Sequence, residues 1–390
     1  MLPNEHSATL YILEMAARFW LTPAAVPMTL EDAMALTEEQ AWRLFAQIRW
    51  GSSKRQCCPK CGKKDQHYNI PSRRRWRCKA CKSTFSVTTR TPFADRKISF
   101  KKLVLGIFTF VISQKGIAAL ALKRVIRCQY RTAFVLLHKL REAIMVTVST
   151  ELLEGRIEMD GAHFSGRPRK GNKAPPKAAA PTIPLKYQQP PPQRQKQPPN
   201  VFPFHPNRRI VMVLRVYGEK GKGAKRTIVE ICKSENAADI EALVAKTVKR
   251  GSLIWTDELS AYGNLKKRGY KHAAVNHTKE FSTKNGVNEN QAESFFSRMR
   301  RAVIGIYHRF TPMYMIDYAN EMAWREDVRR MDTWVQLSSL LERVFDAGVS
   351  KDWCGYAQGH KRAEEILFQA PPAQASAAGA QSPPPPPIIP

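Results

Sequence analysis

Hydrophobic positions follow a helical period in the first 150 residues and a mostly strand-like period afterwards. Residues 1–50 have helical spacing, and Thr29 and Thr37 each precede acidic residues, as expected of capped helix starts. Residues 98–148 also have helical spacing. They predict three helices, which open near Ser99, Gly116 and Tyr130.

The last two of these helices fit a helix-turn-helix, with the turn at Val125–Gln129. The second helix of such a motif is the recognition helix, and polar residues cluster at its expected start. They are Arg127, Gln129, Arg131 and Thr132. A plain helical bundle fits the periodicity equally well, and the position of these polar residues favours DNA binding.

From residue 155 the pattern predicts a mixed α/β domain. The predicted strands are 156–160, 209–217, 226–232 and 253–257, and the predicted helices are 234–248, 290–303 and 313–330. Residues 166–206 interrupt this pattern with twelve of the 27 prolines and no acidic residue. Such a composition cannot bury a core, so we expect a disordered insertion there and a disordered tail at 370–390.

The composition indicates a polyanionic partner. Lys and Arg total 63 against 33 Asp and Glu, a formal net charge of +30. Clustered basic residues release counterions from nucleic acid, which makes DNA the natural partner. The apolar run Leu103–Ile112 is too short to span a bilayer, and the N-terminus lacks a signal-peptide pattern. We therefore expect no membrane association and a location in the reducing cytoplasm, at the nucleoid.

Two cysteine pairs predict a structural zinc site. Cys58 and Cys61 are separated by two residues, as are Cys78 and Cys81, and 16 residues lie between the pairs. This spacing is typical of a zinc ribbon with a closed tetrahedral site. Cys57 competes with Cys58, but Cys58 has the two-residue spacing and the following glycine turn. The ribbon hairpin would present Arg73, Arg74, Arg75 and Arg77 to phosphates, whereas Cys128, Cys232 and Cys354 stand alone.

Three acids predict a second, catalytic metal site. Asp160 lies in the first strand, Asp257 ends the fourth, and Glu293 lies on a later helix. Carboxylates from such elements can hold two Mg²⁺ or Mn²⁺ ions for phosphodiester chemistry. Arg300 follows Glu293 by two helical turns and would hold a phosphate, and Asn290 precedes Glu293 by one turn and would ligate or orient. Glu158 and Glu258 remain competitors.

The ordered motifs resemble the ISXO2-like family of insertion-sequence transposases over residues 30–330. They are Ile48-Arg-Trp-Gly, Cys58-Pro-Lys-Cys-Gly, Trp76-Arg-Cys-Lys-Ala-Cys, Glu158-Met-Asp-Gly, Trp255-Thr-Asp with Tyr262, Val287-Asn-Glu-Asn-Gln-Ala-Glu-Ser-Phe-Phe and Gly305-Ile-Tyr-His. The resemblance implies an RNase H-like DDE domain whose acids are Asp160, Asp257 and Glu293. It also implies binding to terminal inverted repeats, strand cleavage and strand transfer into target DNA, in a homo-oligomeric complex.

The chain departs from the family in two places. Arg300 stands where Lys is common, and the Pro-rich insertion follows Asp160. Asn290 is worth testing beside Glu293, since some relatives place Asn in that motif. The alternatives are a non-catalytic DNA-binding regulator derived from a transposase and a general nuclease of the same fold. A nucleotide-driven motor is disfavoured, because Ala224-Lys225 stands where a P-loop needs Lys followed by Ser or Thr.

These patterns divide the chain into successive segments. The expected boundaries are a helical segment 1–50, a zinc ribbon 51–95, a helical DNA-binding region 96–150, a catalytic domain 151–335 with the insertion 166–207, a helical segment 336–369 and a tail 370–390.

Overall fold

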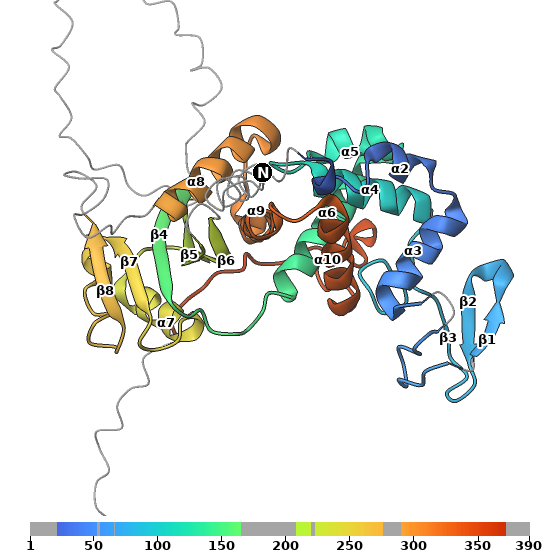
Figure 1. Cartoon of the computed structure of the whole chain (residues 1–390), viewed down its shortest axis with the longest axis horizontal. Helices are drawn as coiled ribbons and strands as arrows, with labels where there is room; N and C mark the ends of the chain where they lie inside the picture. The colour runs from blue at the N-terminus through green and yellow to red at the C-terminus, as the bar shows by residue number, and fades with distance from the viewer. Residues whose placement is uncertain are drawn as a thin grey trace, which may run out of the picture.

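The computed structural model describes residues 22–52, 55–65, 67–164, 208–219, 223–275 and 290–371. The predicted Pro-rich insertion and all but the first two residues of the predicted tail lie outside these ranges. A small ribbon, a lobe of helices and a domain built on a sheet follow one another across the molecule (Figure 1).

The lobe begins with two short helices, α2 (Leu30–Ala35) and α3 (Glu38–Trp50). Both open with a capping box, as their sequences predict. The Thr29 side chain accepts a hydrogen bond from the amide of Asp32, and Thr37 does the same for Gln40. The side chains of Asp32 and Gln40 in turn accept hydrogen bonds from the amides of Thr29 and Thr37, so amides that would otherwise be unpaired are satisfied.

Three further helices complete the middle of the lobe: α4 (Phe100–Ile112), α5 (Ala119–Ile126) and α6 (Tyr130–Val146). Ser99 caps α4 as predicted. The sequence predicted that α5 would start near Gly116, and the helix starts three residues later, at Ala119. Gly116 has a φ of +87°, and a Cβ there would lie 1.8 Å from the hydroxyl of Tyr307, so only glycine fits at this position.

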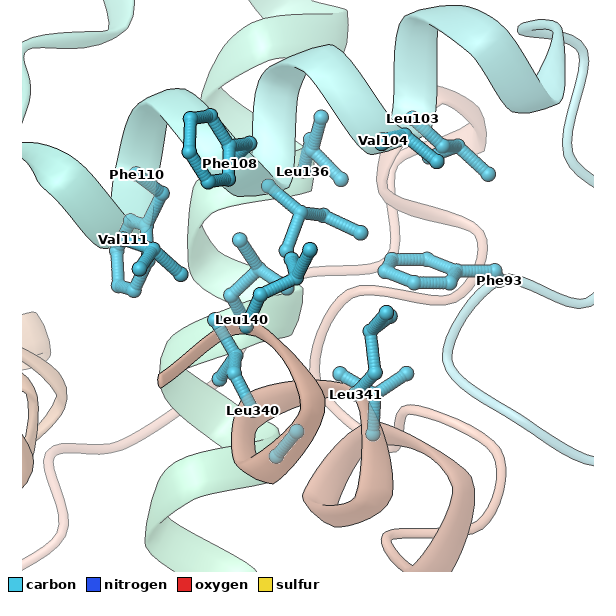
Figure 2. Packing of buried hydrophobic residues seen from close by; sticks show 14 of the residues in the cluster. Phe93, Leu103, Val104, Phe108, Phe110, Val111, Leu136, Leu140, Leu340 and Leu341 are labelled. Carbon is cyan, nitrogen blue, oxygen red and sulfur yellow. The ribbon is translucent and has the colours of Figure 1, made fainter. Parts of the chain in front are cut away.

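Helix α10 (Thr333–Asp346) returns to the lobe, although almost 200 residues separate it from α6. Its apolar face packs against α4 and α6, and Figure 2 shows Leu340 and Leu341 beside Leu136, Leu140 and Phe93. Trp324 and Val328 of α9 (Met315–Val328) join the same buried cluster. The lobe therefore draws its core from segments before and after the sheet domain, and beyond Asp346 only a short turn of helix follows in the described tail.

The second domain is built on five strands in the order β6-β5-β4-β7-β8. They are β4 (Arg156–Phe164), β5 (Arg209–Tyr217), β6 (Ala224–Cys232), β7 (Leu253–Asp257) and β8 (Lys271–Val275). Strands β4, β5 and β6 pair antiparallel, whereas β4, β7 and β8 pair parallel. The sequence patterns predicted four of these strands and missed β8.

Helices cover both faces of this sheet. Ile157 and Met159 of β4 pack toward α7 (Ala237–Thr247), in a core that also contains Tyr262. Ala162 and Phe164 face the other way, toward α8 (Asn290–Ala302) and α9. The result is a three-layer mixed α/β domain, which confirms the predicted RNase H-like class. Even-numbered residues of β4 therefore face α8.

The C-terminal segment lies along the outer edge of the sheet. The Phe368 amide bonds to the carbonyl of Ile231 in β6, and Glu365 pairs with Arg209 of β5. Covering an edge strand in this way blocks pairing with other chains. In the part of the chain that the structure describes, every helix is too short or too polar to cross a bilayer.

Candidate metal centres and nucleic-acid surfaces

The four ribbon cysteines converge on one point. They lie beside a small antiparallel sheet of β1 (His67–Ile70), β2 (Arg75–Cys78) and β3 (Thr84–Phe85). The sulfurs of Cys58 and Cys81 are 3.7 Å apart, and those of Cys61 and Cys78 are 3.6 Å apart. A tetrahedral zinc with Zn–S bonds of about 2.3 Å separates its sulfurs by about 3.8 Å, whereas a disulfide needs about 2 Å. The sulfurs thus fit a structural zinc ion.

Two equivalent turns present these thiols. The amide of Gly62 bonds to the carbonyl of Cys58, and the amide of Lys82 bonds to that of Cys78. Both turn residues have positive φ, +72° and +58°. Cys57 lies outside the cluster, with its sulfur near the carbonyl of Gly62. The geometry thus groups Cys58, and not Cys57, with the other three cysteines.

Aromatic stacking fixes the ribbon to the helical lobe. Trp76 of β2 stacks on Trp42 of α3 with ring centroids 5.5 Å apart, and Trp50 meets Trp76 edge-on at 5.3 Å. Residues 75–78 alternate exposed and buried, so Arg75 and Arg77 point outward while Trp76 points inward. The zinc turns thus hold a basic edge in a defined place on the lobe.

The strand register brings the first two catalytic candidates side by side. Glu158 of β4 lies opposite Trp255 of β7 in a parallel pair. Asp160 and Asp257 each lie two residues further along, so they occupy equivalent positions on the two strands. Neighbouring strands are about 4.8 Å apart, and both acids occupy the face that α8 covers. The Asp257 carboxylate also accepts a hydrogen bond from the amide of Leu259, which holds the turn after β7.

The pKa of Asp160 is affected by several other carboxylates. Burial raises the pKa of Asp160 to about 7, a hydrogen bond from the Gly161 amide opposes this, and the negative charges of Asp257, Glu235 and Glu293 raise it further. Two of the predicted acids, Asp257 and Glu293, therefore act on the third through their charge, and so does Glu235, which the sequence did not reveal. Carboxylates that repel one another in this way favour a divalent cation between them.

This acidic site is more open than the zinc site. Within the described residues, only the four cysteines bring three or more ligand atoms within 4.8 Å of one another. Mg²⁺ keeps several water ligands and takes only one or two protein carboxylates per ion, so a looser arrangement suits it. The donor set, all oxygen, fits Mg²⁺ or Mn²⁺ and not zinc.

Glu158 has a different task from its neighbour Asp160. Its carboxylate is buried and accepts hydrogen bonds from the amides of Gln291 and Ala292, at 2.7 and 3.3 Å. These amides belong to the first turn of α8, whose dipole favours a negative charge at that end. Burial raises the pKa of Glu158 to about 7, and the two amides oppose this rise. Glu158 therefore caps α8 and fixes the helix that carries Glu293.

Helix α8 presents the remaining candidates on its exposed side. Asn290, Glu293 and Arg300 are all exposed, while Phe295, Phe296 and Met299 bury the opposite side. The Arg300 guanidinium lies 5.9 Å from the ring of Phe164 at the end of β4, and 5.8 Å from that of Phe296. Glu258, the competitor of Asp257, is exposed on the turn beyond β7.

The predicted DNA-contacting residues lie on two surfaces. Helices α5 and α6 are joined by a three-residue turn at 127–129, in which Arg127 has a φ of +46°. Arg127, Gln129 and Arg131 are exposed there and Thr132 is half-buried. On the ribbon, Arg73, Arg75 and Arg77 are exposed, but Arg74 makes ion pairs with Glu38 and Glu39 of α3. The positive charge of Arg74 is therefore partly neutralised by the two glutamates of α3.

Two family models match the chain. Residues 152–327 match the ISXO2-like transposase domain, and residues 36–84 match the transposase zinc-ribbon domain. The first match contains all four clustered acids, and the second contains all four clustered cysteines together with α3. Comparison with curated proteins and with solved structures finds no match.

Proposed function

This chain belongs to the ISXO2-like family of insertion-sequence transposases, and from this premise we propose that it cuts and joins DNA at the ends of a mobile element. The observation that carries the proposal is the gathering of Asp160, Asp257 and Glu293 from two strands and a helix into one acidic site. A regulator that only binds DNA has no need for carboxylates that repel one another at one site.

The proposed chemistry assigns each residue a task. Asp160, Asp257 and Glu293 would hold two Mg²⁺ or Mn²⁺ ions, which when bound activate the attacking oxygen and stabilise the leaving one. Arg300 would bind a phosphate of the cut strand, and Asn290 would orient the helix end near the scissile bond. Water attacks first and exposes a 3′-hydroxyl at the element end. This hydroxyl then attacks target DNA, so no Ser or Tyr nucleophile is needed.

DNA recognition would use the two basic surfaces. The first turn of α6, with Gln129, Arg131 and Thr132, would read the terminal inverted repeat, and Arg127 would contact the backbone beside it. Arg73, Arg75 and Arg77 of the ribbon would contact phosphates. Pairing of two element ends requires two active sites, so we propose a homo-oligomer in the active complex.

A cleavage assay tests this proposal. The purified protein is incubated with Mg²⁺ and a duplex that carries the DNA flanking its own coding sequence, and nicked and joined products are resolved. We expect nicking at the element end and joining to target DNA, both abolished by Asp160→Asn and Asp257→Asn. Glu258→Gln is the matched control, because that acid neighbours Asp257 but is exposed on the turn. Binding without nicking would support the regulator, and cleavage without preference for the ends would support a nuclease.

A further inference from the structure

A fourth acid, Glu235, reaches the acidic site from a loop that the family motifs do not include. It lies between β6 and α7, directly before Asn236, which caps α7. Its carboxylate accepts a hydrogen bond from the hydroxyl of Tyr262, which is buried in the short helical turn after β7. Tyr262 therefore holds Glu235 over the end of the strand that Asp257 terminates.

The backbone beside Asp160 makes room for this side chain. Gly161 follows Asp160 directly, and a Cβ at Gly161 would lie 2.7 Å from a carboxylate oxygen of Glu235 and 2.8 Å from the sulfur of Met212. Real Cβ atoms do not approach other atoms this closely, so the position accepts only glycine while Glu235 stays in place. The Glu235 carboxylate thus rests against the backbone next to Asp160.

Three of these acids also have no positively charged partner in the described part of the chain. Among the residues that the structure describes, no Lys or Arg forms an ion pair with Asp160, Asp257 or Glu235. This is unexpected on a chain with a net charge of +30. Asp160, Asp257 and Glu235 are half-buried. Carboxylates removed from water normally pair with a cation or coordinate a metal, so these three leave a place for a divalent ion.

We propose that Glu235 is a positioning residue of the proposed metal site, where its charge strengthens the binding of a divalent cation beside Asp160 and Asp257. Tyr262 orients the carboxylate, and Gly161 leaves space for it. The inference rests on the proposed function for the use of the ion, but the binding of the ion can be measured without any reaction.

The test is a Mn²⁺ titration by calorimetry of the zinc-loaded, DNA-free protein. Glu235→Gln removes the charge but keeps an oxygen that can accept the Tyr262 hydrogen bond. We expect it to weaken Mn²⁺ binding by about tenfold or more, the usual effect of losing a group that supports metal ligands. Tyr262→Phe should give a smaller loss, because the charge remains while its orientation is lost. Glu241→Gln is the control, since Glu241 is on α7 but pairs with Arg268 and Asn264.

The outcomes separate this inference from the proposed function. If Glu235 only ties its loop to Tyr262, Glu235→Gln will bind Mn²⁺ as the wild type does, and the inference is overturned. If Glu235→Gln weakens Mn²⁺ binding while the wild type never nicks DNA, the inference stands and the proposed function fails. In an active enzyme, Glu235→Gln should also raise the Mg²⁺ concentration for half-maximal nicking about tenfold, and thermal unfolding should show that the variant folds.

Discussion

Replacing Asp160 by Asn should stabilise the protein at pH 8 in the absence of Mg²⁺ while abolishing cleavage. Asp160 has its pKa raised from 3.8 to about 7, chiefly by burial and further by nearby carboxylates. Above pH 7 the folded protein must therefore carry a charge that its surroundings disfavour. Asn carries no charge and can still accept the hydrogen bond that the Gly161 amide donates at 2.6 Å.

Proton linkage determines whether the free energy of unfolding rises or falls with pH. Between about pH 4 and pH 7 the folded state binds the Asp160 proton more tightly than the unfolded state does, so the free energy of unfolding falls as pH rises through this window. Raising the pKa of Asp160 from 3.8 to about 7 corresponds to about 4 kcal/mol. Asp160 is partly exposed, and solvent screening reduces this figure, so we expect the Asn variant to gain about 1–2 kcal/mol at pH 8.

Thermal unfolding at pH 5 and pH 8 without added Mg²⁺ measures this difference. A gain of 1–2 kcal/mol should raise the Tm of the variant by about 2–8 °C at pH 8. At pH 5 the gain should be only about a third as large, because that pH lies one third of the way through the window. Adding Mg²⁺ should then raise the Tm of the wild type but not that of the variant, because the proposed Mg²⁺ site needs the Asp160 carboxylate. Glu154→Gln, which removes an exposed carboxylate, is the control. An Asn variant less stable than the wild type at pH 8 would refute the reasoning.

Further predictions concern the structural parts of the molecule. Cys78→Ser should remove the zinc from the purified protein, measured by atomic absorption, whereas Cys57→Ser should retain it; equal zinc in both would contradict the assigned ligands. Glu158→Gln should lower kcat for nicking about tenfold with a smaller change in Mg²⁺ affinity, because α8 loses its charged cap; unchanged kcat would argue against that role. Arg141→Met should cost about 3 kcal/mol in urea unfolding, because Glu321 keeps a buried charge without this partner, and adding Glu321→Leu should recover part of the loss.

Features set by nearby residues were predictable from the sequence. The threonine caps of α2 and α3 and the paired cysteines depend on residues within a few positions of each other, and all are found in the structure. The α/β class was predictable as well, because strands and helices have different hydrophobic periods. The choice between Cys57 and Cys58 also followed from local spacing.

Features set by distant residues were not predictable in this way. Strand β8, Lys271–Val275, has no run of β-branched residues and is a strand because it pairs with β7. Position 116 must be glycine because Tyr307, almost 200 residues later, occupies the space beside it. Glu235 has no motif around it and joins the acids only through Tyr262 and the missing side chain of Gly161. Pairwise contacts across the fold decide each of these cases.

The surface proposed to read DNA and the acidic site are joined through buried contacts between α6 and α9. Arg141, in the middle of α6, donates a hydrogen bond to Glu321 of α9 at 2.6 Å, and both side chains are buried. Helix α9 in turn packs on β6 and α8. Because charged pairs without solvent tolerate little displacement, the first turn of α6 is held at a fixed position relative to α8. If α6 reads the element end, the distance from the recognised bases to the cut is therefore a property of the fold.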